Sequence, residues 1–182
     1  MEKGEESLED IVQKLHKQYK RICGVNYPHG YIPPYCRRPI WKQLVGIIAA
    51  LQRSNIAHMD LKPQNILRVG NVLKACDLGI SKYGAGFGSD EMSNFSAPEA
   101  MLLQGRYDPK VDIWSLGAIL YYMTYGKQPN RDPGNRSWEP PYGHRVVADP
   151  LLHDVLVKTL QYKPHDRADL QTLQRHPYTR LP

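Results

Sequence analysis

Four polar side chains in the middle of the chain have the types needed for chemistry on a phosphate group. Asp60, Lys62 and Asn65 lie within six residues, and Asp77 follows seventeen residues after Asp60. Phosphoryl transfer depends on a positioned hydroxyl and on neutralised phosphate charge more than on covalent chemistry, and Mg²⁺ prefers hard oxygen ligands. Taken singly, Asp60 could be a turn residue, Asn65 a cap and Asp77 the end of a strand. Their meaning therefore depends on the elements around them.

A short β-hairpin is predicted between Asn65 and Asp77. Residues 66–69 and 72–75 are β-type runs, and the Gly-Asn pair at 70–71 favours a tight turn between them. Because a hairpin returns the chain to its starting point, it should bring Asp77 back beside Asn65. The two side chains are expected on one rim of a cleft although they are distant in sequence.

The rest of the pattern predicts a mainly α-helical chain. Apolar residues recur at helical spacing from 8 to 19, after a Ser7–Asp10 pair that resembles a capping box, and Pro39 suits the first position of a second helix that ends near residue 55. Residues 111–125 are almost wholly apolar, which is typical of a helix buried at the centre of a domain. The other expected elements are short helices at about 151–160 and 170–175 and loops at 24–38, 84–96 and 128–142.

The four polar residues belong to longer motifs in a fixed order. The motifs are His58-Met59-Asp60-Leu61-Lys62-Pro63-Gln64-Asn65, Asp77-Leu78-Gly79 and Ala97-Pro98-Glu99. In order and spacing they resemble the catalytic loop, the magnesium-binding turn and the end of the activation segment of eukaryotic protein kinases. Together with the buried helix, this combination is very specific.

The resemblance implies a role for each residue. Asp60 would accept the proton of the substrate hydroxyl, and Lys62 would stabilise the transferring phosphate. Asn65 and Asp77 would hold Mg²⁺ and, through it, ATP. Lys62 is also the choice typical of serine/threonine kinases, so the implied activity is ATP-dependent phosphorylation of serine or threonine in proteins, with tyrosine as a further acceptor.

Three more positions resemble residues that support a kinase active site. Glu99 resembles the acid that pairs with an arginine near the C-terminal helices, and Arg167 is the candidate partner. Asp112, at the head of the buried helix, resembles the residue that hydrogen-bonds the backbone of the catalytic loop; the simpler interpretation is a charge at a helix N-terminus, and both can hold. His58 is expected to be a packed structural histidine.

Within the kinases, the chain resembles the monopolar-spindle (TTK) dual-specificity family. The resemblance rests on residues 112–127, on the catalytic loop with Met59 in place of the usual Arg, and on the ending at 176–178. It implies a role in mitosis at the spindle checkpoint, with kinetochore or checkpoint proteins as partners and a location in the cytoplasm and nucleus, including the kinetochore. Leu78 in place of Phe is a second departure. Ser89, Ser93 and Ser96 are candidate activating phosphosites.

The resemblance also sets the expected domain. We interpret residues 1–182 as the C-terminal lobe of a protein kinase domain, with a hinge-like segment at 1–6 and an activation segment at 77–99. The Gly-rich loop and the strand lysine that clamp ATP in the N-terminal lobe are not among these residues, so the chain as given is expected to be inactive. The alternative is a non-catalytic kinase-like scaffold or interaction module, which would have no need of the intact catalytic set.

Composition excludes several other classes. The chain of 182 residues carries a formal net charge of +6 but no long Lys/Arg run, so a nucleic-acid partner is not expected. Three cysteines without CxxC spacing argue against a zinc site or a disulfide framework. The longest apolar run, 45–51, is too short to cross a bilayer, so no membrane partner is expected.

Overall fold

The computed structural model describes residues 6–23, 32–78, 94–100, 108–131, 136–144 and 147–181. The fold is mainly helical with one small antiparallel sheet, as predicted. In chain order the elements are β1 (Glu6–Ser7), α1 (Leu8–Cys23), α2 (Pro34–Arg53), the 3-10 turn η2 (Pro63–Asn65), β2 (Ile66–Val69), β3 (Val72–Ala75), α3 (Lys110–Tyr125), α4 (Pro150–Thr159), the 3-10 turn η4 (Pro164–Asp166), α5 (Leu170–Arg175) and α6 (Pro177–Arg180).

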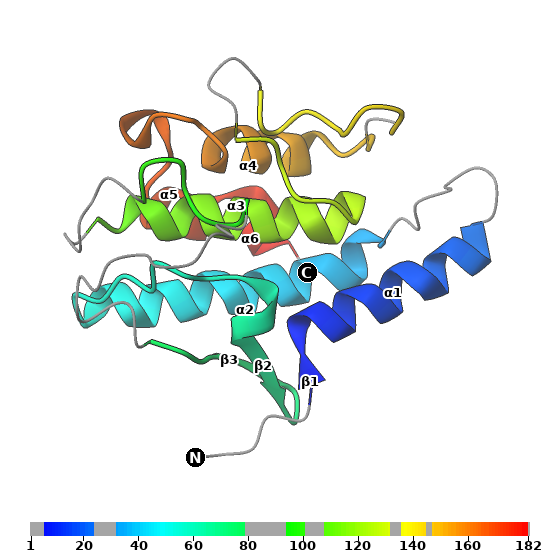
Figure 1. Cartoon of the computed structure of the whole chain (residues 1–182), viewed down its shortest axis with the longest axis horizontal. Coiled ribbons are helices and arrows are strands. Elements are labelled where there is room, and N and C mark those ends of the chain that lie inside the picture. Colours follow the sequence, from blue (N-terminus) through cyan, green and yellow to red (C-terminus); the bar gives the residue numbers. More distant parts are fainter. Residues whose placement is uncertain are drawn as a thin grey trace.

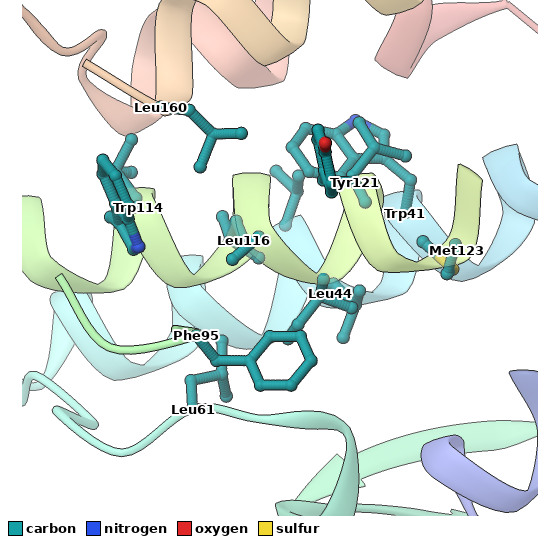
Figure 2. Close-up of a cluster of buried hydrophobic side chains, with 14 of the residues drawn as sticks. Trp41, Leu44, Leu61, Phe95, Trp114, Leu116, Tyr121, Met123 and Leu160 are labelled. Atoms are coloured by element: carbon teal, nitrogen blue, oxygen red, sulfur yellow. The ribbon is translucent and has the colours of Figure 1, made fainter. Parts of the chain in front are cut away.

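Helix α3 forms the centre of the fold. In Figure 1 the layers run from α4 through α3 to α2, with the sheet beyond α2, and α4 and α2 both contact α3. Almost every residue of α3 is buried, which confirms the prediction made from its apolar sequence. Figure 2 shows Leu160 on one side of α3 and Leu44, Phe95 and Leu61 on the other, so the helix is enclosed from both sides. This buried helix is the centre against which the neighbouring layers pack.

The predicted capping box begins α1. The amide of Asp10 donates to Ser7 Oγ over 3.2 Å, and the amide of Ser7 donates to Asp10 Oδ2 over 3.2 Å. These reciprocal bonds satisfy two amides that a helix start leaves without partners. The helix continues to Cys23, four residues beyond the predicted end at Tyr19.

Helix α2 begins five residues earlier than the sequence suggested. Pro34, not Pro39, occupies its first turn, and Pro39 lies inside the helix. A proline that begins a helix costs no hydrogen bond, whereas Pro39 removes one. The buried Arg37 ties the first turn to the core, because its Nη1 donates to Thr124 Oγ1 of α3 over 2.9 Å.

The hairpin has the predicted bounds. Ile66 pairs with Ala75 and Val69 with Val72, and Gly70 adopts a φ of +59° in the turn, where a side chain would be strained. The sequence did not reveal β1, whose two residues pair antiparallel with β2. A strand of two residues leaves no alternation of polar and apolar side chains to recognise.

The remaining predictions divide by region. Helices α4 and α5 lie where expected within one residue, and α6 was missed. The described parts of the loop at 128–142 contain no helix or strand. Most of the predicted loops lies outside the described residues, namely 24–31 of the loop at 24–38 and 84–93 of the loop at 84–96. Gly79, Ser89 and Ser93 also lie outside them. None of the helices in the described ranges has the length and apolar character needed to span a membrane.

Candidate active site

Asp60, Lys62 and Asn65 form one contact cluster. Lys62 Nζ lies 2.9 Å from Asp60 Oδ2, and Asn65 Nδ2 donates to the same oxygen over 3.0 Å and to the Asp60 carbonyl over 2.9 Å. The turn η2 makes these contacts possible, because the backbone amide of Asn65 donates to the Lys62 carbonyl. The Lys62 side chain is 32% exposed and the Asp60 side chain 17%, so the cluster can be reached from solvent.

Asp77 lies at the end of β3, next to the residue that pairs with Asn65. The Cys76 amide donates to the Asn65 carbonyl over 2.9 Å, which extends the hairpin by one step. Asp77 itself adopts a φ of +62°, a left-handed conformation that Asp tolerates better than most residues. In the part of the chain that the structure describes, no hydrogen bond or ion pair joins Asp77 to Asp60, Lys62 or Asn65. The hairpin thus brings the backbones together, as expected, without direct contact between the side chains.

Asp112 makes the predicted bonds to the backbone of the catalytic loop. Its carboxylate accepts from the His58 amide over 2.8 Å and from the Met59 amide over 3.0 Å. Burial raises the pKa of the Asp112 carboxyl, while the two amides act in the opposite direction. His58 is fully buried, and its Nε2 donates to the Cys76 carbonyl over 3.0 Å. It is therefore a packing residue that ties the catalytic loop to the segment before Asp77.

The predicted ion pair between Glu99 and Arg167 is present. Arg167 Nη1 and Nη2 reach the two oxygens of Glu99 over 2.5 and 2.7 Å. The same guanidinium donates to the carbonyls of Gln161, Tyr162 and Lys110 over 2.7, 3.0 and 3.1 Å. A bidentate pair of this kind fixes the orientation of both groups. It joins the segment that ends at Glu99 to α3 and to the C-terminal helices.

The donor set suits a magnesium ion held partly by substrate. Because both hydrogens of the Asn65 amide point to Asp60, the amide oxygen is directed away from Asp60 and is available as a ligand. That oxygen and the Asp77 carboxylate are hard donors of the kind Mg²⁺ prefers. Within the described ranges, no three His, Cys, Asp or Glu side chains gather as they would to hold a metal alone. Mg²⁺ sites that use substrate phosphates need only one or two carboxylates.

Comparison with known families matches residues 6–179 to the protein kinase domain. The chain belongs to the protein kinase family. Membership implies ATP, a divalent metal ion and protein substrates in general.

Among curated kinases, the chain is 30% identical over 180 residues to the dual specificity protein kinase TTK of Mus musculus, covering 82% of this chain and 20% of that protein. It is 31% identical over 165 residues to the serine/threonine-protein kinase ULK3 of Homo sapiens, covering 82% of this chain and 35% of that protein. It is 28% identical over its whole length to the probable serine/threonine-protein kinase mps1 of Dictyostelium discoideum, 20% of which it covers. The chain thus spans about a fifth to a third of the length of these relatives.

The candidate site adjoins one residue, Glu9, that the sequence did not single out. The Glu9 carboxylate accepts from Tyr122 Oη of α3 over 2.6 Å, from Gln64 Nε2 of the catalytic loop over 3.1 Å and from Gln13 Nε2 over 2.6 Å. Burial, followed by the bond to Glu9, raises the pKa of Tyr122. In the sequence Glu9 is an ordinary acid in the first turn of a helix. Only its pairing with Gln13 has a recognisable spacing, because the other contacts are tertiary.

Proposed function

We propose that this chain supplies the phosphate-transferring residues of a protein kinase that phosphorylates serine or threonine, with tyrosine as a further acceptor. The observation that carries the proposal is the contact of Asp60 with both Lys62 and Asn65. A carboxylate, an ammonium and an amide that converge from six residues of chain match the needs of phosphoryl transfer. A non-catalytic scaffold would not require this arrangement.

Each side chain has a distinct task in the proposed reaction. Both contacts to Asp60 fall on Oδ2, which leaves Oδ1 to accept the proton of the substrate hydroxyl. Lys62 is partly exposed and carries a flexible positive charge that can move from Asp60 to the transferring phosphate. Asn65 donates to the same carboxylate oxygen and helps to hold Asp60 in place. These residues position the acceptor and neutralise charge, which is most of what the reaction demands.

Asn65 and Asp77 are the residues that would hold Mg²⁺ and, through it, the phosphates of ATP. When bound, the ion would neutralise charge on the phosphates of ATP. The Asn65 amide oxygen is oriented for this by the two bonds of its nitrogen. Asp77 contributes the only full negative charge that we assign to the metal.

The test measures transfer of labelled phosphate from ATP to a peptide with a single serine. We compare the purified chain with the chain joined to an N-terminal lobe that carries a Gly-rich loop and a strand lysine. Transfer is expected only from the joined protein, because each lost contact to phosphate is worth roughly 1.5–3 kcal/mol. Robust turnover by the chain alone, abolished by Asp60→Asn, would contradict this requirement.

Asp60→Asn in the joined protein tests the catalytic assignment. The loss of a general base typically lowers the rate on the order of 10²–10⁴-fold. Asp169→Asn is the matched control, because it makes the same change at an exposed carboxylate that caps α5. If Asp60→Asn and Asp169→Asn leave equal activity, Asp60 is not the base and the proposal fails.

We further propose a role in mitosis at the spindle checkpoint, with location in the cytoplasm and nucleus and at kinetochores. The support is the resemblance of residues 112–127 and of the catalytic loop to the TTK kinases, together with 30% identity to the mouse relative. The chain is similarly identical to ULK3, so sequence identity alone does not select the TTK kinases and an experiment must decide. A fluorescent fusion imaged in dividing cells should collect at kinetochores before chromosome separation, and an even distribution at that stage would contradict the proposed role.

A further inference from the structure

A groove lies between α1 and the C-terminal end of α3. Glu9 lies between this groove and the catalytic loop, since it contacts residues of both. Its volume is about 290 Å³. The residues that line it are Gln13, His16 and Lys20 of α1, and Tyr122, Tyr125 and Lys127 at and after the end of α3. The spacing of i, i+3 and i+7 places the three α1 residues on one face of that helix. The groove is therefore a surface formed jointly by two helices.

The lining of the groove is cationic. Lys20 and Lys127 are both exposed, and no carboxylate is among the lining residues. Within the part of the chain that the structure describes, neither lysine forms an ion pair. Glu9, in the first turn of α1, bonds the lining residues Gln13 and Tyr122, and its carboxylate already accepts three hydrogen bonds. Among the described residues, no acid therefore neutralises the two ammonium groups.

The floor of the groove is fixed by contacts between the helices. His16 Nε2 donates to the Tyr122 carbonyl over 3.2 Å, and the two rings meet edge to face with centroids 6.3 Å apart. Gly126 ends α3 with a φ of +67°, and an added Cβ there would lie 3.6 Å from the His16 ring. The Tyr122 carbonyl also accepts from the Gly126 amide over 2.8 Å. Two donors on this carbonyl reduce the negative charge that the C-terminus of α3 would otherwise present.

A chain of side-chain contacts links the groove to the catalytic loop. Tyr122 lines the groove and bonds Glu9, which also accepts from Gln64. Gln64 precedes Asn65, whose amide bonds Asp60. These contacts connect a residue that lines the groove with the proposed phosphorylation site.

We propose that this groove is a recognition subsite for anionic side chains of a protein substrate, on one side of the residue to be phosphorylated. The ligand chemistry is a carboxylate or a phosphate group, held by Lys20 and Lys127. The inference rests on the proposed kinase function but names a substrate preference that the catalytic residues do not determine. Since the ammonium groups are exposed, the contacts add selectivity of modest size and depend on ionic strength.

The experiment measures binding in the absence of ATP, by fluorescence anisotropy of labelled peptides with a central serine. One peptide carries two Glu residues on the N-terminal side, a second carries them on the C-terminal side, and a third has Gln at all four positions. A fourth set replaces each Glu pair by phosphoserine and separates phosphate from carboxylate as the preferred anion. We expect one of the two Glu arrangements to bind on the order of 10-fold more tightly than the Gln peptide, with the difference lost at about 0.5 M salt.

The double variant Lys20→Glu with Lys127→Glu should remove this difference. The matched control is Lys74→Glu with Lys163→Glu, which reverses two exposed lysines on β3 and before η4. We expect the control to keep the preference, and circular dichroism melting to show all proteins folded. Equal binding of Glu and Gln peptides, an equal gain for both Glu arrangements, or the same loss in the control would overturn the proposal.

Phosphate transfer by the joined protein, measured beside peptide binding, separates this inference from the kinase proposal. Transfer without any preference for anionic peptides would leave the kinase function standing and reject the subsite. Binding with the expected preference but no transfer would reject the kinase function instead.

Discussion

Replacing either member of the Glu99–Arg167 pair should destabilise the fold, and the two replacements should differ in size. The Arg167 side chain has no exposed surface and its guanidinium lies 5.1 Å from the ring of Trp114. Besides Glu99, it serves three backbone carbonyls. Arg167→Ala therefore leaves a carboxylate and three backbone carbonyls without their donor at once. We expect a loss of about 3–5 kcal/mol in the free energy of unfolding, as for a broken buried ion pair.

Glu99→Ala should cost less, because Arg167 keeps its three carbonyl partners and its contact with Trp114. The loss is then that of charge-assisted hydrogen bonds, about 1.5–3 kcal/mol. The Glu99 side chain is also 14% exposed, so part of its charge is already solvated. The double variant should lose much less than the sum, with a coupling energy of about 1–3 kcal/mol, since the second change removes no further bond between the pair.

Urea denaturation measures these losses in the free energy of unfolding. The wild type, both single variants and the double variant together form one double-mutant cycle. Arg167→Lys is a useful fourth variant, because it keeps the charge but cannot make the bidentate contact. It should recover only part of the loss. If the two single losses add, or if Glu99→Ala proves the costlier change, the reasoning from the contacts of Arg167 is wrong.

Two further predictions concern metal binding and pH. Without bound nucleotide, Asp77 and Asn65 should bind Mg²⁺ with a dissociation constant of about 1 mM at best, near −4.1 kcal/mol. Their backbone amide NMR resonances should shift when Mg²⁺ is added. Shifts that persist in the Asp77→Asn variant would contradict the site. Asp169 caps α5 by accepting from the Thr172 amide over 2.7 Å, and this bond holds the pKa of its carboxyl below the ordinary value. Because the pKa of this carboxyl is lower in the folded than in the unfolded protein, the bond stabilises the fold at pH values above the ordinary carboxyl pKa. This stabilisation is lost as pH falls through the lowered value. Asp169→Asn should remove this pH dependence of stability, and an acid transition that the variant leaves unchanged would refute the prediction.

The sequence predicted the elements whose signals are local. The capping box at Ser7 fixed the start of α1, and the turn at Gly70 fixed the hairpin, because both depend on residues within a few positions. The start of α2 was misplaced because Pro39 suited the first helical position and the residues before it were interpreted as a loop. The contact of Arg37 with Thr124 on α3, which ties the true first turn to the core, is tertiary. Pairings across the fold leave no such periodic signal.

The same limit applies to the candidate site. Resemblance assigned Asp60, Lys62 and Asn65, and their mutual contacts follow from a segment of six residues. Glu9 could not be found in this way, since its partners Gln64 and Tyr122 lie 55 and 113 positions away. An acid in the first turn of a helix is adequately explained by the helix dipole, so nothing in the sequence calls for a second role.

Met59 shows how the buried helix determines the shape of the catalytic loop. It adopts a φ of +67°, a conformation that costs a residue with a side chain roughly 1–2 kcal/mol. Asp112 accepts from the Met59 amide and from the amide before it, and both bonds are buried. Such bonds can hold a strained residue because breaking either would leave a buried donor without a partner. The next residue is Asp60, so the conformation that α3 imposes at Met59 sets the direction in which the proposed base leaves the backbone.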